Sequence, residues 1–397
     1  MLILANKRQR ANGEGSIMKN IRNGKQIGWR ASLTIGRYES GALKRKEFYG
    51  KTKKEVQTKL DEYKRQMSMG VLSDDKLTVE SWFYTWLFDF RSKDMKPKTF
   101  ELYEGIYRVY IKDSEIANIK LSDLRTPHLQ RYYNKLLDID KLEISNVNRI
   151  NNRLKTCLTE AEKQGYIQRN WCKMVTLPKV EKIKEINVLS KDEQIKFIEA
   201  IKGNDMELLF LMALGTGLRL GEILGLKWSD IDFKEGTLSV NRTVQRVTDI
   251  QKDGSRKMVL IEQTPKTKNS YRTVPIPQNI LIQLKIHKKN QNGLILSLGE
   301  SYQNNNYVLC ENTGKAYDPN KPNRRLTSIL KANDMDHIKF HGLRHTYATR
   351  LFEAGIPPKT VQALMGHSDI SLTLDIYTHV MKETKLEAVE KINSIFG

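Results

Sequence analysis

Residues 341–377 have the sequence HGLRHTYATRLFEAGIPPKTVQALMGHSDISLTLDIY, and this stretch decides the fold around it. Its first part belongs to a helical region that we expect over about residues 339–365. On such a helix His341 and Arg344 lie one turn apart on the same face, where they can hold one anion together. His341 and His345 also have the spacing of a metal-binding pair, but position 342 is Gly and the HExxH motif is absent.

A second segment, residues 213–230, has the sequence ALGTGLRLGEILGLKWSD. It places Arg219 directly after a turn of small residues, and glycines at such a turn let the backbone approach a ligand closely. The residues that follow, up to Trp228, predict a helix with one buried side. Taken alone, this segment also fits an ordinary surface arginine.

These two segments lie in a C-terminal domain that we expect over residues 190–397. Ser190 and Glu193 form a capping box at its start. Helices are expected over about residues 190–226 and 339–365, and residues 236–276 alternate like strands between them. The pattern predicts a mainly helical domain with a small antiparallel sheet.

The N-terminal segment, residues 1–72, is strongly basic and predicts a small sheet. Strand-like stretches at 29–35 and 44–49 are separated by turn signals such as Asn23-Gly24. Thr52 and Glu55 then form the capping box of a helix. We expect a three-stranded sheet covered by one helix, with exposed Lys and Arg facing a DNA groove.

Residues 77–178 predict an all-helical domain. Apolar and aromatic residues recur at helical spacing in two stripes, and Thr126 is a predicted N-cap with Pro127 at the first helical position. The stripes are Tyr103, Ile106, Tyr107 and Tyr110, and Val147, Ile150, Leu154 and Leu158. A charged, aperiodic stretch marks a linker over residues 179–189, so the fold class is a multidomain α+β protein.

The charge of the chain favours nucleic acid as the partner. The 67 Lys and Arg outnumber 46 Asp and Glu, giving a net charge of +21, and such an excess attracts polyanions. A basic membrane-surface protein is the alternative, but no lipidation motif and no dominant basic amphipathic helix is present. The longest apolar run, residues 208–214, is too short for a bilayer, and the N-terminus lacks the order of a signal peptide. We therefore expect a cytoplasmic protein.

Breaking a DNA backbone without a metal ion requires a nucleophile, fixed cations and a proton donor. Negative charge gathers on the non-bridging oxygens in the transition state, and the planar fork of arginine grips two of them. The leaving oxygen needs a proton. Gly366-His367 and, ten residues after that histidine, Tyr377 complete the set begun by Arg219, His341 and Arg344. A tyrosine has an ordinary pKa near 10 but becomes a plausible nucleophile beside arginines that favour the phenolate.

The order and context of these residues resemble the signature of the tyrosine recombinase (lambda-type phage integrase) family. The matching patterns are TGLRxxEIxxLxWxDI around Arg219, HxLRHTxAT from His341, and LMGHSxxxxTxxxYTH around Tyr377. They span most of the C-terminal domain. The layout of the whole chain also resembles integrases of conjugative transposons, with an arm-type DNA-binding domain (1–72), a core-binding domain (77–178) and a catalytic domain (190–397).

The resemblance implies a role for each matching residue. Arg219 and Arg344 would bind the scissile phosphate, and His341 would hydrogen-bond it and assist proton transfer. His367 would hold a non-bridging oxygen and position the tyrosine. Tyr377 would attack phosphorus, forming a 3′-phosphotyrosine link and freeing a 5′ hydroxyl.

The family's remaining residue is a lysine on a strand turn that protonates the leaving oxygen. Lys266 in the segment TPKTKN (264–269) matches this position best, and Lys268 remains an alternative. Because the phosphotyrosine bond keeps the energy of the broken phosphodiester, the resemblance implies no cofactor. Gly50-Lys51-Thr52 resembles the end of a Walker motif, but the required first Gly falls on Arg45.

The resemblance further implies a bacterial enzyme, associated with the nucleoid when bound to DNA. Such an enzyme integrates and excises a mobile element as a homotetramer on double-stranded DNA, at core and arm sites. Excisionase and DNA-bending proteins are the expected accessory partners. The C-terminal stripe of Leu386, Val389, Ile392 and Phe396 predicts a helix that packs either on its own domain or on a neighbouring subunit.

Two other functions share these features. A type IB topoisomerase uses the same chemistry on a single duplex, and a DNA-binding regulator could keep the fold without activity. The basic N-terminal sheet argues against the first, and the complete residue set against the second. Cys157, Cys172 and Cys310 form no CxxC pattern, so we predict neutral thiols rather than a zinc site or disulfides.

Overall fold

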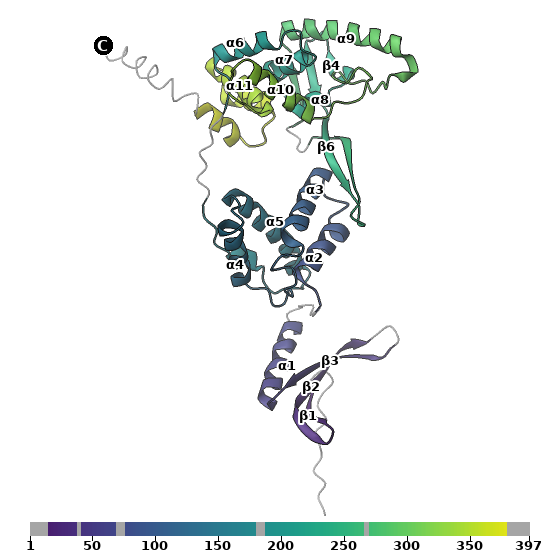
Figure 1. Ribbon diagram of the computed structural model, residues 1–397, viewed down its shortest axis with the longest axis vertical. Helices are drawn as coiled ribbons and strands as arrows, with labels where there is room; N and C mark the ends of the chain where they lie inside the picture. The colour runs from purple at the N-terminus through teal and green to yellow at the C-terminus, as the bar shows by residue number, and fades with distance from the viewer. Residues whose placement is uncertain (1–14, 38–40, 69–75, 180–186, 266–269, 379–397) are drawn as a thin grey trace, which may run out of the picture. The chain divides into compact units, whose positions relative to one another are not determined.

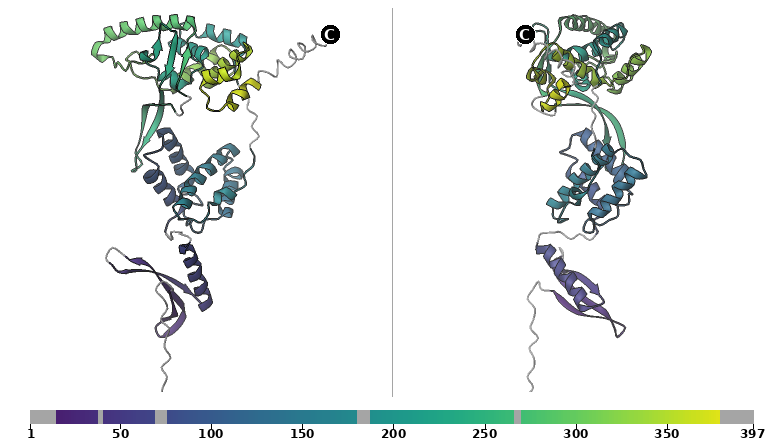
Figure 2. Two further views of the ribbon diagram at one scale, coloured as in Figure 1. Left: turned by 180° about the vertical axis from the view of Figure 1, so that it is seen from behind. Right: turned by 90° about the vertical axis from the view of Figure 1, so that its left-hand side faces the viewer.

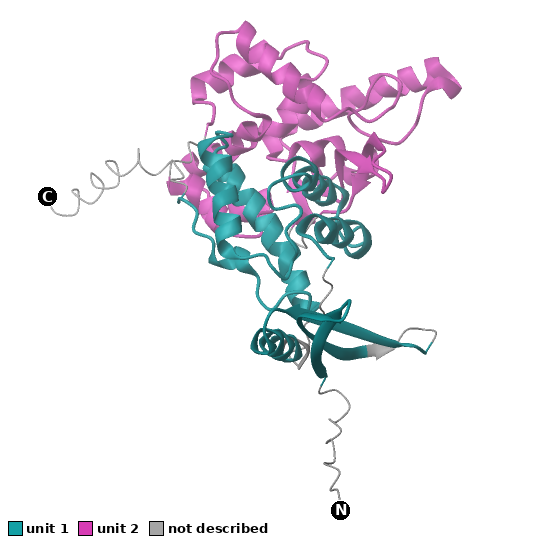
Figure 3. Cartoon of the chain, turned by 60° about the horizontal axis from the view of Figure 1, so that its bottom comes forward, with its two compact units in different colours: residues 1–181 teal, residues 182–397 magenta. Residues whose placement is uncertain are grey.

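The computed structural model describes residues 15–37, 41–68, 76–179, 187–265 and 270–378. The chain forms two compact units, Met1–Glu181 and Lys182–Gly397 (Figure 3). Each unit is built around its own buried residues. No helix in the described ranges is both long and apolar enough to cross a bilayer.

The first unit begins with an antiparallel sheet of three strands in the order β1-β2-β3, with one helix packed on it (Figure 1). These are β1 (Ser16–Arg22), β2 (Lys25–Arg37), β3 (Leu43–Gly50) and α1 (Lys53–Ser68). Ala31 and Leu33 of β2 are buried with Val56 and Leu60 of α1. The predicted sheet and its covering helix are therefore confirmed.

Two local signals explain this sheet and its helix. Asn23 and Gly24 both have positive φ (49° and 76°), as the tight turn of a twisted hairpin requires. Thr52 caps α1 as predicted, since its Oγ1 accepts from the Glu55 N–H at 3.2 Å. The Glu55 carboxylate accepts from the Lys51 N–H at 2.9 Å, one residue before the position that a capping box would use.

The rest of the first unit is helical, as predicted. Its elements are α2 (Val79–Thr85), η1 (Trp86–Phe90), α3 (Pro97–Ile106), η2 (Tyr107–Ile111), α4 (Thr126–Asp138), α5 (Ile144–Lys163) and η3 (Trp171–Met174). Trp82, Trp86 and Leu154 are among its most buried side chains. The N-cap prediction for α4 is wrong by one residue: Arg125 is the N-cap, and its N–H is satisfied by Nδ1 of His128 at 3.2 Å.

The second unit packs helices around a small sheet of strands β4, β5 and β8 (Figure 1). The strands are β4 (Ile231–Asp232), β5 (Thr237–Val240) and β8 (Arg272–Pro275). Strands β6 (Thr243–Ile250) and β7 (Arg256–Gln263) form a separate hairpin that projects from this unit (Figure 2). The described strands between residues 236 and 276 are antiparallel, as predicted.

The helices of the second unit are more numerous than the sequence pattern indicates. They are α6 (Lys191–Ala200), α7 (Glu207–Thr216), α8 (Leu220–Leu224), η4 (Trp228–Asp230), α9 (Gln278–Leu298), η6 (Gly299–Ser301), α10 (Asn320–Ala332), α11 (Phe340–Glu353) and α12 (Pro358–Met365). The regions expected to be helical, about 190–226 and 339–365, are helical as predicted, and each is divided into separate helices. Positive-φ glycines at 203, 217 and 355 divide them, because a left-handed residue ends a helix.

Helix α11 connects the parts of the second unit. Its first half contributes Phe340 and Leu343 to the main core, and its second half contributes Ala348 and Phe352 to a smaller cluster. The chain enters this unit along the same helix. Leu189 donates its N–H to Thr346 Oγ1 at 3.0 Å, and its carbonyl accepts from Arg350 at 2.5 Å.

Candidate active site

Two arginines from distant parts of the sequence meet beside the end of α12. Arg219 precedes α8, immediately after the left-handed turn at Gly217 (φ 62°). Arg344 lies on α11 and is 1% exposed. Its Nη1 donates to the Gly217 carbonyl at 2.5 Å and its Nη2 to the Met365 carbonyl, while Nε has no partner among the described residues. The turn of small residues and the HxxR helix therefore converge.

Glu222 is a buried carboxylate held between Arg219 and Arg272. Arg219 donates through its backbone N–H at 2.9 Å and through Nη1 at 2.8 Å. Arg272 donates through Nη2 at 2.8 Å and Nη1 at 3.2 Å. Although burial disfavours the ionised form, these two arginines lower the pKa of Glu222 to about 2.

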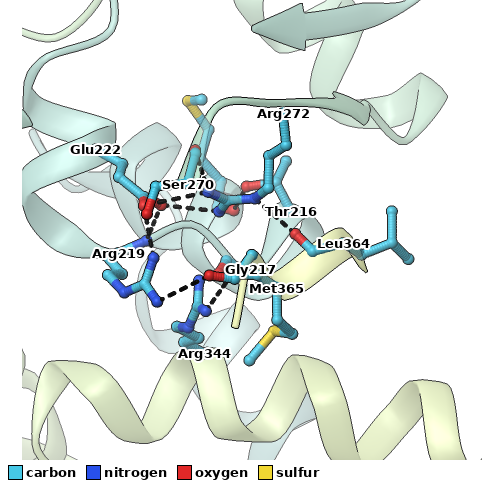
Figure 4. Close-up of polar contacts among 11 residues, drawn as sticks. Thr216, Gly217, Arg219, Glu222, Ser270, Arg272, Arg344, Leu364 and Met365 are labelled. Atoms are coloured by element: carbon cyan, nitrogen blue, oxygen red, sulfur yellow. Dashed lines mark hydrogen bonds and ion pairs between the residues drawn. The ribbon is translucent and has the colours of Figure 1, made fainter. Parts of the chain in front are cut away.

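The last carbonyls of α12 accept hydrogen bonds from three arginines (Figure 4). Arg272 donates to Leu364 at 2.8 Å, Arg344 donates to Met365, and Arg219 donates to Gly366 at 3.4 Å. Gly366 ends the helix with φ 63°. Free carbonyls at a helix C-terminus carry partial negative charge, so this end attracts and aligns cations.

His367 follows the end of α12 directly. It is 6% exposed, and its Nδ1 lies 2.9 Å from Thr373 Oγ1. Burial, followed by the nearby Arg344 and Arg219, lowers the pKa of His367 to about 3. The imidazole is therefore neutral at pH 7, with one ring nitrogen fixed by Thr373.

His341 and His345 form an edge-to-face pair at the start of α11, with ring centroids 4.5 Å apart and planes at 86°. Desolvation by the surrounding protein, then the neighbouring His345 and Arg344, lower the pKa of His341 to about 4. The pKa of His345 is also lowered by burial. In the described ranges no group of three or more His, Cys, Asp or Glu is placed to hold a metal ion.

Tyr377 lies in helical residues 371–378, one turn after Thr373. Its ring packs edge to face on Phe352, with centroids 5.2 Å apart, and belongs to the smaller cluster around Ala348, Val361 and Met365. No hydrogen bond among the described residues joins its hydroxyl to the arginines or histidines. The structure brings Arg219, His341, Arg344 and His367 together, and it connects the Tyr377 segment to them through Thr373.

Lys266 and Lys268 lie outside the described residues. Their segment leaves at the end of β7 and returns through Ser270 to Arg272, at the start of β8. The Ser270 carbonyl accepts from Arg272 Nη1 at 3.3 Å. The chain therefore re-enters the described structure beside the Glu222 ion pair.

Arg272, Glu222 and Thr373 have no role in the site predicted from the sequence. Thr373 and Glu222 are specified positions in the patterns quoted above, so those patterns could have pointed to them as site residues. Arg272 had none, because its partners Glu222 and Leu364 are 50 and 92 residues away in the chain. Together these residues can donate hydrogen bonds to an anion from arginines and from neutral histidines. The neutral imidazoles can also take part in proton transfer.

Comparison of this chain with known proteins identifies a matching family and relatives. Residues 187–384 match the sequence model of the phage integrase family, and residues 78–137 match that of the phage integrase N-terminal SAM-like domain. A tyrosine recombinase XerC-like protein of Caldanaerobacter subterraneus subsp. tengcongensis is 45% identical over 385 residues, covering 95% of this chain and 98% of that protein.

One further relative and one solved structure of similar fold come from transposons. The transposase of transposon Tn916 from Enterococcus faecalis is 30% identical over 219 residues, covering 52% of this chain and 51% of that protein. Among solved structures, the Tn1549 transposon integrase in complex with a circular intermediate DNA has a TM-score of 0.64 at 20% identity. That match covers 80% of this chain and 99% of that one, and it shows a shared fold.

Proposed function

The chain belongs to the phage integrase family and is a tyrosine site-specific recombinase, and on this premise we propose that it integrates and excises a mobile DNA element. It cuts double-stranded DNA and rejoins it through a 3′-phosphotyrosine link at Tyr377. The observation that carries the proposal is the convergence of Arg219 and Arg344 on one helix end, with His367 beside them.

Arg219 and Arg344 bind the scissile phosphate in this proposal. Both guanidinium groups currently donate to carbonyl oxygens, which a phosphate oxygen can replace as acceptor. Cations held in position by the protein stabilise the charge of the transition state without having to reorganise. Arg344 remains charged even though burial and Arg219 lower its pKa to about 9.

The histidines complete the phosphate site. His341 and His367 are neutral at pH 7, so each can donate one N–H to a phosphate oxygen. The Thr373 contact leaves the far nitrogen of the His367 ring for that bond. Lys266 protonates the leaving 5′ oxygen, with Lys268 as the alternative.

Tyr377 attacks the phosphorus in this proposal, and its ring packs on Phe352. Since Thr373 and Tyr377 share one helical segment, movement of this segment also bears on His367. The Tn1549 and lambda integrases have been solved on DNA, which supports DNA as the partner. A homotetramer that joins two DNA sites, with excisionase and DNA-bending partners, completes the proposal.

A nicked suicide substrate tests this function. The nick lets a short fragment diffuse away after cleavage, so the covalent intermediate accumulates. We expect a protein–DNA adduct that forms without a metal or nucleotide and is absent from Tyr377→Phe. The Tyr347→Phe variant serves as a control for the loss of a half-buried hydroxyl on α11 and should still form the adduct.

A second assay separates recombination from single-duplex relaxation. Two duplexes of different length that carry the element's ends should yield recombinant products of the predicted lengths. Adducts and religation without exchange between duplexes would instead indicate topoisomerase-like activity. Absence of any adduct with wild-type protein would contradict both.

A further inference from the structure

We propose that Arg272 is a positioning residue for DNA cleavage, one that acts through Glu222, Arg219 and the end of α12 without touching the phosphate. This inference rests on the function proposed above. Arg272 lies on β8, next to the segment that contains Lys266, and its side chain is 6% exposed. Arg272 therefore joins strand β8 to helix α8, through Glu222, and to the end of α12, through Leu364.

All three guanidinium nitrogens of Arg272 are already engaged by the protein. Nε donates to the Leu364 carbonyl at 2.8 Å, and Nη1 donates to Glu222 and Ser270. Nη2 donates to Glu222 at 2.8 Å (Figure 4). This buried, two-pronged ion pair fixes the orientation of both side chains, because the planar fork fits one carboxylate geometry.

The first consequence concerns charge. Glu222 binds Arg219 as well as Arg272, so one carboxylate is shared by two guanidinium groups. Without Arg272 the buried carboxylate would keep Arg219 as its sole ion-pair partner, and a buried charge holds its remaining partner strongly. Glu222 would then compete with the scissile phosphate for Arg219. Arg272 neutralises Glu222 and leaves the charge of Arg219 for the phosphate.

The second consequence concerns geometry. Arg272, Arg344 and Arg219 hold the carbonyls of Leu364, Met365 and Gly366, and His367 is the next residue. Arg272 holds the Leu364 carbonyl, the first of the three along the chain, and is bound to the β-sheet, since Arg272 pairs with Val240. It anchors the helix end so that the other two arginines can exchange their carbonyl partners for phosphate oxygens.

The test compares single-turnover cleavage of two nicked substrates under saturating protein. One has an ordinary scissile phosphate, and the other has a methyl group in place of one non-bridging oxygen, which removes the charge. For Arg272→Met we expect DNA binding within about threefold of wild type and cleavage of the ordinary substrate reduced by about 100-fold, near the loss caused by removing one transition-state donor. The loss on the uncharged substrate should be at least about tenfold smaller, because less charge remains for Arg219 to neutralise.

Arg242→Met is the matched control. Arg242 forms a comparable ion pair with the buried Asp230 in the same unit. Its loss should lower the melting temperature while the cleavage rates on both substrates stay within about threefold of wild type at saturation. Ordinary cleavage by folded, DNA-bound Arg272→Met at the wild-type rate would overturn the proposal, and so would equal losses on the two substrates.

A second variant covers the case in which Arg272→Met folds poorly. Combining it with Glu222→Gln removes the competing carboxylate, so the double variant should cleave faster than Arg272→Met alone. A double variant that folds and gains nothing would contradict the charge argument. Failure of wild-type protein to form any adduct would instead refute the proposed function, so the two failures are distinguishable.

Discussion

Arg344 shows how a buried charge can be kept ready for a ligand. It is 1% exposed, yet Arg219 lies close enough to contribute to lowering its pKa. Two carbonyls compensate its charge, and their alignment places the guanidinium at the end of α12. A phosphate that binds here would gain two cations already in position, without the cost of ordering them.

Replacing Arg344 with Ala should separate binding from chemistry. We expect cleavage to fall by about 100-fold or more, since one fixed donor to the transition state is lost. DNA affinity should change little, because many other Lys and Arg contribute to it. Gel-shift titration measures the affinity and single-turnover cleavage measures the rate. Arg344→Lys should keep only part of the wild-type cleavage rate, because lysine lacks the planar fork. Equal losses of affinity and cleavage would contradict this role.

His367 should make the stability of the free protein sensitive to acid. Its pKa is about 3 in the folded chain and near the ordinary 6.5 when unfolded. The unfolded chain therefore binds this proton first as the pH falls below 6.5, and the free energy of unfolding decreases from there toward pH 3. Above pH 6.5 His367 is neutral in both states, so it does not lower the free energy of unfolding. Urea denaturation at several pH values should give a shallower decrease for His367→Gln, and an unchanged slope would count against the buried, neutral state.

The sequence motifs predicted most residues of the candidate site, because the motifs contain the residue types that the chemistry needs. Arg219, Arg344 and His367 meet around one helix end, with His341 close enough to act on the pKa of His367, although their catalytic roles and that of Tyr377 remain proposals. Arg272 was not predictable. A single arginine on a strand has no local pattern, and only the folded chain shows that its partners lie on α8 and α12.

The site depends on where helices stop. Helix α7 ends at Gly217, whose carbonyl binds Arg344, and α12 ends at Gly366, whose carbonyl binds Arg219. Both glycines have positive φ. The sequence predicted the turn of small residues before Arg219 and the end of the helical region near 365. It did not predict which carbonyls bind the arginines, because those partners are distant in the chain. The Gly355-Ile356-Pro357-Pro358 segment did carry a stop signal, and it separates α11 from α12.

Gly217→Ala tests the importance of the break before Arg219. The position has φ 62°, and an added Cβ would lie 2.3 Å from the ring of Tyr347. We expect a loss of about 1–3 kcal/mol in unfolding free energy from overpacking and backbone strain, measurable by chemical denaturation. Gly203→Ala is a useful comparison, since its φ is also positive but nothing lies within 4 Å of the added Cβ. Equal effects of the two changes would show that the contact with Tyr347 is unimportant.

At the scale of the whole molecule, the net charge predicted a nucleic-acid partner, and the order of the elements predicted the fold class. The three-stranded sheet, the helical segment and the mixed C-terminal unit follow from short-range patterns and are present in the structure. The packing of α9 and α10 depends on long-range contacts, which no local pattern encodes. The three-domain division of the chain stays a prediction beside the two compact units.

The net charge of +21 predicts that DNA binding weakens steeply with salt. Each phosphate neutralised by Lys or Arg releases condensed counterions, and the logarithm of affinity falls linearly with that of salt concentration. Titrations between about 50 and 200 mM salt should therefore lose roughly a thousandfold in affinity or more. A nearly flat response would contradict the interpretation of the charge.

The apolar stripe from Leu386 to Phe396 lies outside the described residues, and its packing on a neighbouring subunit is our proposal. Deleting the residues after 383 should weaken the joining of two DNA sites more than binding to one site. Native gels with one and two site-bearing duplexes compare these losses. Equal losses would refute packing between subunits.

The central claim is that Tyr377 is the nucleophile, served by arginines and histidines around one phosphate. The most direct measurement is to trap the adduct on a nicked substrate, digest the protein and identify the DNA-linked peptide by mass spectrometry. We predict a single attachment at Tyr377, through a 3′ phosphate, with a free 5′ hydroxyl on the other strand end. Attachment at another residue, or to a 5′ phosphate, would contradict the account.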